Sequence, residues 1–167
     1  NVVILRFSNS IFEPILNSQY VDQVQIIASE DFGVESRGEF YDSYGAVKDF
    51  FQSHLLQMLS LVVMSSPDRL DSKCIRDEKV EAFRNVEIQD LITGQYEGYQ
   101  REKGVMEDSK TETLVAARVG LNNSRWKDVP FYLLSGKNLV KKYEDIYIKF
   151  SQTNHSPVER EGGTVPN

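Results

Sequence analysis

The sequence predicts an α+β fold for a single domain. A length of 167 residues suits one domain and is enough to bury a sizeable core. Several short runs have the composition of strands, yet few of them are joined by short hairpin turns. Residues 46–64 instead repeat apolar side chains at spacings of three and four, which predicts one long helix. Separate strands and helices of this kind are typical of α+β proteins.

The composition is that of a folded protein without a strongly basic surface. Hydrophobic residues make up 40% of the chain and charged residues 26%, which disfavours disorder. The net charge of −6 leads us to expect no nucleic-acid and no membrane partner. No apolar run approaches a membrane span, and no signal peptide is visible. Cys74 is the only cysteine, which excludes an internal disulfide and is compatible with a reducing compartment. We expect a cytoplasmic protein.

The first thirty or so positions predict two strands and a short helix. Residues 2–7 are mainly apolar and indicate a buried strand, and residues 11–16 indicate a short helix. Residues 21–29 alternate, which predicts a second strand with Val24, Ile26 and Ala28 on one face. Glu30 falls at the end of this strand, where an exposed acid is the ordinary interpretation. Because the chain opens on Asn1 directly into a strand-like run, we expect it to be part of a longer protein.

The long helix follows a glycine-punctuated aromatic loop at residues 37–45. We expect Asp42 or Ser43 to cap the helix, and its almost entirely apolar surface to place it in the core. Asp49 would ordinarily be a solvated first-turn acid favoured by the helix dipole. His54 falls on the apolar stripe, where it is ordinarily a core histidine bonded to a backbone carbonyl, although imidazole also serves proton transfer.

The rest of the chain predicts further elements in order. We expect a loop at 67–75, an amphipathic helix at 76–84, a charged loop or flap at 100–112, strands at 113–121, 129–134 and 145–150, and a flexible polar tail or truncated loop at 151–167. No cysteine and histidine spacing suggests zinc, no Gly-x-Ser-x-Gly suggests a hydrolase, and no Gly-x-Gly-x-x-Gly is present. We therefore expect no metal site.

A basic turn at residues 135–142 separates two of these strands. Gly136 lets the backbone approach a ligand closely, and Lys137, Lys141 and Lys142 gather three ammonium groups. This pattern suits an anion, and a solvated lysine-rich turn is the alternative.

A long motif across residues 32–57 carries a family resemblance. Phe32-Gly33, Arg37-Gly38, Phe40-Tyr41-Asp42, Gly45, Asp49 and Gln52-x-His54-Leu55-Leu56-Gln57 resemble the substrate-domain signature of glucose-6-phosphate dehydrogenases. The run L-R-F-S-N-S-I-F-E-P from Leu5, R-D-E-K-V from Arg76, G-Q-Y from Gly94 and R-W-x-x-V-P-F from Arg125 are similar to other segments of that family. We therefore interpret residues 1–150 as a partial substrate (C-terminal) domain of this family.

The resemblance implies a large, predominantly antiparallel sheet with helices packed on one face. It implies that His54 takes the proton from the anomeric hydroxyl of glucose 6-phosphate while a hydride passes to NADP, giving 6-phosphogluconolactone in the oxidative pentose phosphate pathway. Glu30 and Asp49 would hold sugar hydroxyls, and Lys137 and Lys142 would contact the phosphate. A homo-oligomer is expected for the complete enzyme.

Several features depart from the family pattern. Ser36 and Glu39 replace glycines, Lys48 and Leu134 replace arginines, Ser53 replaces an asparagine, and Tyr143 replaces a lysine of members with a structural coenzyme site. The family's D-H-Y-L-G-K segment and its coenzyme domain are not in this sequence. We therefore expect the chain alone to be inactive. The carboxy-terminal segment that normally completes the sheet in the family is also not in this sequence, so we expect an exposed sheet edge. A catalytically silent relative or fragment, acting as a structural or interaction domain, is the competing interpretation.

Overall fold

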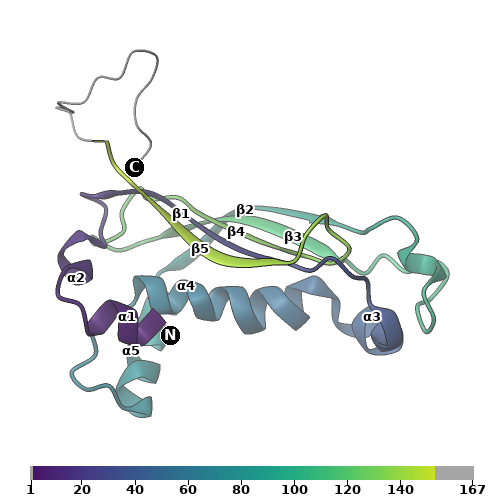
Figure 1. Ribbon diagram of the computed structural model, residues 1–167, viewed down its shortest axis with the longest axis horizontal. Coiled ribbons are helices and arrows are strands. Elements are labelled where there is room, and N and C mark those ends of the chain that lie inside the picture. Colours follow the sequence, from purple (N-terminus) through teal and green to yellow (C-terminus); the bar gives the residue numbers. More distant parts are fainter. Residues whose placement is uncertain (1, 153–167) are drawn as a thin grey trace.

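Five strands form one mixed sheet, and the helices lie on one side of it (Figure 1). The structure is a computed structural model and describes residues 2–152. In space the order is β2-β3-β4-β1-β5, with β1 at Val21–Ser29, β2 at Val86–Gly94, β3 at Leu114–Leu121, β4 at Phe131–Gly136 and β5 at Tyr143–Phe150. β1 and β4 run parallel, while the other neighbouring pairs are antiparallel. The predicted α+β class, with a predominantly antiparallel sheet and helices on one face, is confirmed.

The inner face of the sheet forms the core together with the long helix. Ile26 on β1 pairs with Leu133 on β4 and Ile146 on β5, and Ile26 and Leu133 are fully buried. Leu55 and Leu59 of the long helix are also fully buried in the same cluster. Val24, Ile26 and Ala28 are buried, as their alternation predicts.

The first element is a helix, α1 (Val2–Phe7), and the strand predicted at residues 2–7 is wrong. A short apolar run cannot be assigned to strand or helix from periodicity alone. The helical form lets the buried Arg6 donate to the Leu61 carbonyl at 3.0 Å and to Glu13, which also pairs with Arg125 at 2.7 Å. Burial lowers the pKa of Arg6 to about 10, although Glu13 opposes the shift. The predicted helix at 11–16 is present as α2 (Phe12–Ile15).

Residues 35–46, which include the predicted aromatic loop, are helical. A short 3₁₀ helix, η1 (Glu35–Arg37), leads into α3 (Gly38–Ala46). Gly38 suits the start of α3 because a side chain there would collide with the Lys103 carbonyl. Gly45 breaks the helical path with a φ of 70°, a left-handed value that favours glycine. The loop predicted at 37–45 is therefore wrong, although its glycines do mark the two ends of the element.

The long helix predicted at residues 46–64 is confirmed, in two parts. It begins as a wide π-helix, η2 (Val47–Leu55), and continues as α4 (Leu56–Val63). Neither Asp42 nor Ser43 caps it. Instead, the Ala46 N–H donates to the Glu112 carbonyl at 2.9 Å and the Val47 N–H donates to the Glu112 side chain at 3.0 Å. Glu112, far away in the sequence, thus accepts hydrogen bonds from the first N–H groups of the helix, which no local sequence pattern could reveal.

The remaining helices and strands differ from their predictions mainly in where they begin and end. α5 (Ser72–Arg84) begins earlier than predicted because Asp71 caps it, accepting from the N–H groups of Lys73 and Cys74. A short 3₁₀ helix, η3 (Tyr99–Arg101), opens the predicted flap. The predicted strands at 113–121, 129–134 and 145–150 are present with slightly shifted ends. Of the tail predicted at 151–167, only residues 151 and 152 are described. No described helix is long and apolar enough to span a membrane.

Strand β2 lies at one edge of the sheet and has no counterpart among the predicted strands. Seven consecutive residues, from Glu87 to Thr93, are exposed, so no buried face imposes an alternating pattern. The expected exposed sheet edge is present among the described residues, where β2 and β5 each have one neighbouring strand.

The junction at Gly45 generates a stability prediction. We expect Gly45→Ala to lower the free energy of unfolding by about 1–2 kcal/mol, because a left-handed backbone disfavours a side chain. The added Cβ would also collide with the Glu112 carboxylate that caps the long helix. Urea denaturation followed by circular dichroism measures the change.

Gly94→Ala is the matched control for this prediction. The nearest atoms to a Cβ at Gly94 belong to Leu114 at 3.8 Å, an ordinary contact, so the free energy should change little. Equal losses in the two variants would contradict a special role for Gly45.

Candidate functional site

Two strands bring candidate residues to the same edge of the sheet. Because β1 and β4 are parallel neighbours, their carboxyl ends lie side by side, with Ser29 paired to Gly136. The Glu30 N–H donates to the Gly136 carbonyl, and the Leu139 N–H donates to the Glu30 carbonyl, both at 2.9 Å. The strand end at Glu30 and the basic turn at 135–142 are therefore held against one another. Carboxyl ends of parallel strands are common ligand sites in sheets.

Glu30 and Lys137 form a largely buried ion pair at this edge. The Lys137 Nζ lies 2.5 Å from the Glu30 Oε2, and the side chains are 7% and 21% exposed. The same ammonium lies 5.3 Å from the ring centre of Phe32 and 5.2 Å from that of Tyr41. Contacts between the cation and two aromatic faces add to its stability away from water. Two residues that the sequence suggests for different ends of a sugar phosphate are thus in direct contact.

Tyr41 is a buried tyrosine whose phenol is influenced by several acidic residues. Its side chain is almost fully buried, and burial raises the pKa of its phenol well above the usual value. The charges of Asp49, Glu112 and Glu30 raise that pKa further. Glu30 and Asp49 therefore both act electrostatically on the Tyr41 phenol, although no hydrogen bond among the described residues joins them.

The wide helix η2 brings Asp49 and His54 closer to one face. In an α-helix, two residues five positions apart point in directions that differ by roughly 140°. In a π-helix the hydrogen bonds themselves join residues five apart, so such residues lie nearly one above the other. The Ser53 hydroxyl donates to the Asp49 carbonyl at 2.5 Å within this widened turn. The π-helix thus reduces the angle between the directions of Asp49 and His54 relative to an α-helix.

Asp49 is paired rather than merely solvated. Its side chain is 16% exposed and lies 3.2 Å from the guanidinium of Arg37. Arg37 also lies over the ring of Phe40, at 5.0 Å from the ring centre. Arg37 is therefore a site residue whose role the sequence did not reveal, although it belongs to the motif that carries the resemblance.

His54 is exposed, and the interpretation as a core histidine is wrong. Its ring stacks on Phe50 with centres 4.6 Å apart and planes 23° apart. Within the described residues no hydrogen bond occupies the imidazole. The π-helical turn explains the exposure, because it rotates His54 away from the position that an α-helical stripe predicts. The stacked, exposed ring is free to accept a proton from a ligand.

The basic turn divides into a buried and an exposed part. Lys137 is buried against Glu30, whereas Lys141 and Lys142 are exposed. Among the described residues, no hydrogen bond or ion pair joins Lys142 or His54 to another of the five candidates. The structure thus directly pairs Glu30 with Lys137, pairs Asp49 with Arg37, and leaves His54 and Lys142 open to solvent.

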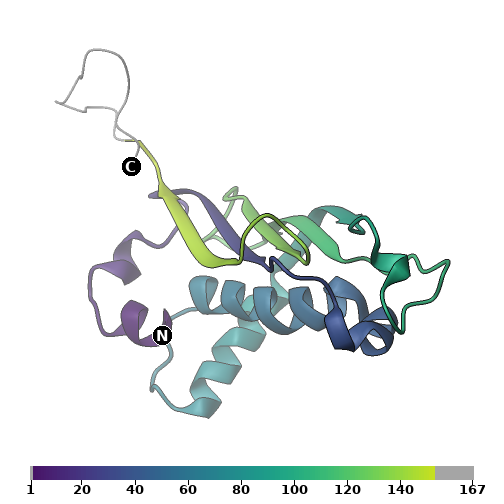
Figure 2. The same cartoon turned by 45° about the vertical axis from the view of Figure 1, so that its right-hand side comes forward.

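A flap at residues 99–112 packs against α3 and is fastened by Asp42 (Figure 2). The Asp42 carboxylate accepts hydrogen bonds from the Tyr99 hydroxyl at 2.9 Å, the Met106 N–H at 3.3 Å and the Ser109 hydroxyl. Burial raises the pKa of Asp42, but these donors outweigh it and hold the pKa below the ordinary value. No group of three or more His, Cys, Asp or Glu in residues 2–152 could hold a metal ion.

The sequence is similar to that of known enzymes over most of its length. Residues 3–167 match the family model described as glucose-6-phosphate dehydrogenase, C-terminal domain. The chain is 45% identical to glucose-6-phosphate 1-dehydrogenase of Borreliella burgdorferi, over 91% of this chain and 35% of that protein. It is 43% identical to the cytoplasmic enzyme 5 of Arabidopsis thaliana, over 90% and 30% of the two chains. The chain thus spans about a third of the length of these relatives.

Solved structures agree with the sequence comparisons. A glucose-6-phosphate 1-dehydrogenase from Mycobacterium avium superposes with a TM-score of 0.88 and 38% identity, over 93% of this chain and 35% of that one. A glucose-6-phosphate dehydrogenase in complex with its substrate glucose-6-phosphate superposes with a TM-score of 0.86 and 33% identity, over 100% and 36% of the two chains. Both identities are high enough for the likeness to extend beyond the fold.

The Asp42 clamp generates a pH-dependent prediction. A carboxylate whose pKa is lowered by folding contributes stability above its unfolded pKa of about 3.9, and that contribution is lost as the pH falls through the folded pKa. Asp42→Asn should therefore loosen the flap by about 1.5–3 kcal/mol at neutral pH, and the difference from wild type should shrink in acid. Hydrogen exchange of the amides of residues 99–112 measures the loosening.

Asp108→Asn is the control, since Asp108 is an exposed flap acid that makes no hydrogen bond with the described residues. A difference between wild type and Asp42→Asn that stays constant from neutral pH to acid would contradict the clamp.

Proposed function

The chain belongs to the glucose-6-phosphate dehydrogenase family, and we propose that it supplies the sugar-phosphate site and catalytic base of an NADP-dependent enzyme. The observation that carries the proposal is the cluster at one sheet edge, where the Lys137 ammonium of the Glu30–Lys137 pair lies 5.2 Å from the ring centre of Tyr41. The charge of Asp49 acts on the same tyrosine. A hexose phosphate offers hydroxyls for the carboxylates and an anion for the lysines. The complete reaction converts glucose 6-phosphate to 6-phosphogluconolactone.

His54 is the proposed general base. It is exposed and stacked on Phe50, so the ring is held in one plane while its nitrogens remain available. A neutral imidazole in this position accepts the proton of the anomeric hydroxyl. Asp49, one turn of the π-helix away, holds a neighbouring hydroxyl, so that one helix both orients the sugar and takes its proton. Arg37 keeps the Asp49 carboxylate in place.

The proposed phosphate contacts are unequal. Lys137 is already neutralised by Glu30 and is largely shielded from solvent, so a ligand meets the pair rather than a free ammonium. Lys142 is exposed, with no ion pair among the described residues, and can offset phosphate charge directly. Lys142 is therefore the residue on which discrimination between a sugar phosphate and a free sugar depends most.

NADP, when bound, would supply the hydride-accepting chemistry of the reaction. The described residues do not form a site for it. Within residues 2–152 the sheet has a single parallel pair, and the sequence has no glycine-rich phosphate loop. We therefore assign to this chain only the binding of the sugar phosphate and the handling of its proton, and derive no step through NADP.

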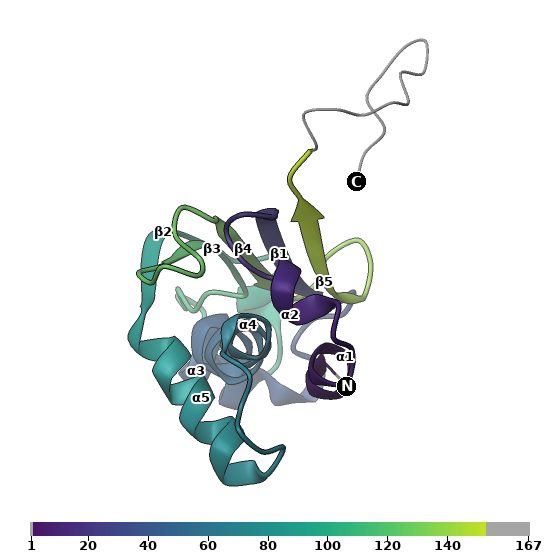
Figure 3. The same cartoon turned by 90° about the vertical axis from the view of Figure 1, so that its left-hand side faces the viewer.

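We also propose that the complete enzyme is a homo-oligomer and is cytoplasmic. Support for assembly comes from the outer face of the sheet, because the described helices all lie on the opposite face (Figure 1, Figure 3). Tyr132 on β4 and Tyr147 on β5 flank Gln25 there, and both tyrosines are exposed. Aromatic side chains on a flat face favour packing against a second copy. A cytoplasmic location is supported by the Arabidopsis thaliana relative described as cytoplasmic, whereas other relatives are described as chloroplastic.

The exposed lysine gives a test of phosphate recognition. In the complete enzyme, Lys142→Ala should weaken glucose 6-phosphate by roughly ten- to a hundredfold, the worth of one charged hydrogen bond. Free glucose should lose little, because it carries no phosphate. Values of kcat/KM for the two sugars measure the difference.

Lys141→Ala is the matched control for Lys142→Ala, since it removes the same charge from the adjacent exposed position. Equal losses for both sugars, or equal losses in both variants, would exclude a phosphate contact at Lys142.

The exposed histidine gives a test of catalysis. In the complete enzyme, His54→Asn should reduce kcat by roughly 10²–10⁴, the usual share of a positioned base. The melting temperature should change little, because only the stacking on Phe50 is lost. The acidic limb of the pH–rate profile should also disappear. Gln52→Ala, at an exposed position of the same helix, should leave kcat near wild type.

A His54→Asn enzyme that is folded, binds glucose 6-phosphate and turns over within tenfold of wild type would refute the assignment. A complete wild-type protein that binds the sugar phosphate without turnover would instead identify a catalytically silent relative.

A further inference from the structure

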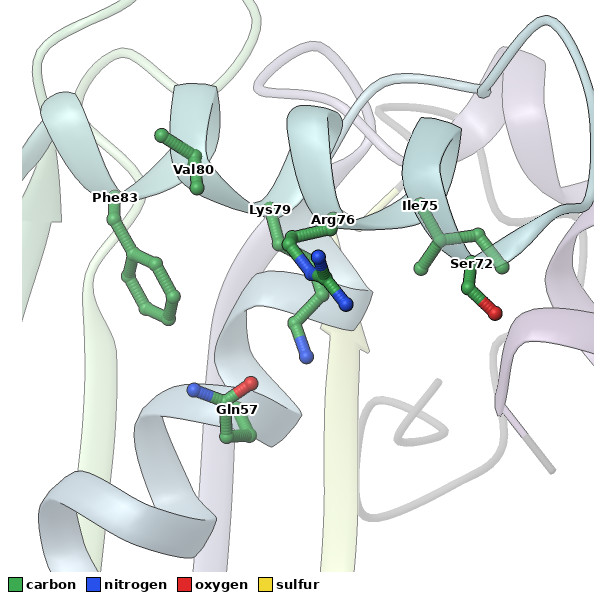
Figure 4. A pocket seen from close by; sticks show the side chains of 7 residues that line it. All are labelled: Gln57, Ser72, Ile75, Arg76, Lys79, Val80 and Phe83. Carbon is green, nitrogen blue, oxygen red and sulfur yellow. The ribbon is translucent and has the colours of Figure 1, made fainter.

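A pocket lies between α4 and α5, apart from the five candidate residues (Figure 4). It has a volume of about 460 Å³, within the range of small-molecule sites. Gln57 lines it from α4, and Ile75, Arg76, Lys79 and Phe83 are among the lining residues from α5. Figure 4 shows the side chains of Arg76, Lys79 and Phe83 extending from α5 toward Gln57. The pocket therefore combines two cations, an amide and an apolar wall.

The two cations in the pocket form no ion pair with the described residues. Arg76 and Lys79 are three residues apart, so they lie on the same face of α5. The ion pairs within α5 are Lys73 with Asp77 and Arg84 with Glu81, and in the described part of the chain none involves Arg76 or Lys79. Burial lowers the pKa of the Lys79 ammonium, and no nearby carboxylate opposes that effect. Although the protein has a net charge of −6, Arg76 and Lys79 form no ion pair with the described residues that line or surround this pocket.

The chemistry of the lining defines the class of ligand. A guanidinium and an ammonium one turn apart can together hold a dianionic group, with arginine donating two parallel hydrogen bonds. A phosphate monoester carries close to two negative charges near neutral pH, whereas a single carboxylate carries one. Ile75, Val80 and Phe83 add an apolar surface beside the cations, and a flat ring packs well on an aromatic side chain.

We propose that this pocket is a second ligand site and binds an aromatic organic phosphate, the chemical class of the nucleoside monophosphates. The phosphate lies between Arg76 and Lys79, and the aromatic ring lies against Phe83. Gln57 offers an amide to the polar edge of that ring. This site is distinct from the sugar-phosphate site and does not depend on the proposed dehydrogenase activity.

Binding of adenosine 5′-monophosphate to the full 167-residue chain tests the proposal. Two-dimensional ¹H–¹⁵N NMR should show shifts centred on α5 and on Gln57, and the titration gives the dissociation constant. Arg76→Gln and Lys79→Gln should each weaken binding by about tenfold or more, because each removes a charged hydrogen bond. Lys73→Gln is the matched control, since it removes the same charge from the same helix at a side chain already paired with Asp77.

Inorganic phosphate and adenosine, titrated separately, distinguish the two halves of the ligand, and each should bind at least tenfold more weakly than the whole nucleotide. Phosphate binding as tightly as the nucleotide would identify an adventitious ion only and overturn the proposal. Shifts centred on residues 137–142, or Arg76→Gln and Lys79→Gln variants that bind like Lys73→Gln, would overturn it as well. The same two variants in the complete enzyme, with NADP saturating its own site, should show the same weakening. Their failure to do so would overturn the proposal for the complete enzyme.

Discussion

The parallel pairing of β1 with β4 is the constraint on which the site depends. It brings Glu30 and Lys137 together although 106 residues lie between them in the sequence. Side chains alternate between the two faces of a strand, so a slip of one residue in this register would exchange the faces. Lys137 would then leave Glu30, and the pair could not form. The chain between β1 and β4 builds the helices, the flap, β2 and β3, and then returns β4 beside β1.

The Glu30–Lys137 pair specifies a geometry more than it stabilises the fold. Moving two charges out of water is costly, and their attraction often does no more than offset that cost. Here the ammonium also lies near the rings of Phe32 and Tyr41, which limits its movement. The same rings keep water from one side of the pair. A ligand that enters this edge therefore meets polar groups that are already oriented, which is favourable for recognition because little reorganisation remains.

An element can be predicted from the sequence where a buried face imposes a regular spacing of apolar residues. It cannot be predicted in this way where contacts with distant residues determine the structure. The alternation of Val24, Ile26 and Ala28 was enough to place β1, and the long helix was evident from its apolar spacing. β2 carried no such signal because nearly all of it faces solvent, and the apolar run of α1 fits either a strand or a helix. Asp49 and His54 are candidates because they belong to a contiguous motif, which can identify His54 but not its exposure. That exposure depends on a π-helix, whose hydrogen bonds leave no mark in the spacing of apolar residues.

The end of the flap fixes the position of the helix that carries Asp49 and His54 relative to the basic turn at residues 135–142. Glu112 caps the helix that carries Asp49 and His54, through its carbonyl and its carboxylate. The next residue, Thr113, accepts a hydrogen bond at 2.9 Å from the backbone N–H of Lys137. Two consecutive residues thus fasten the helix start and the basic turn to the same short piece of backbone. A shift of the flap would move the proposed base and the proposed phosphate contacts together, because both are anchored to it. The segment predicted as a charged loop or flap is therefore the structural link between the proposed base and the proposed phosphate contacts.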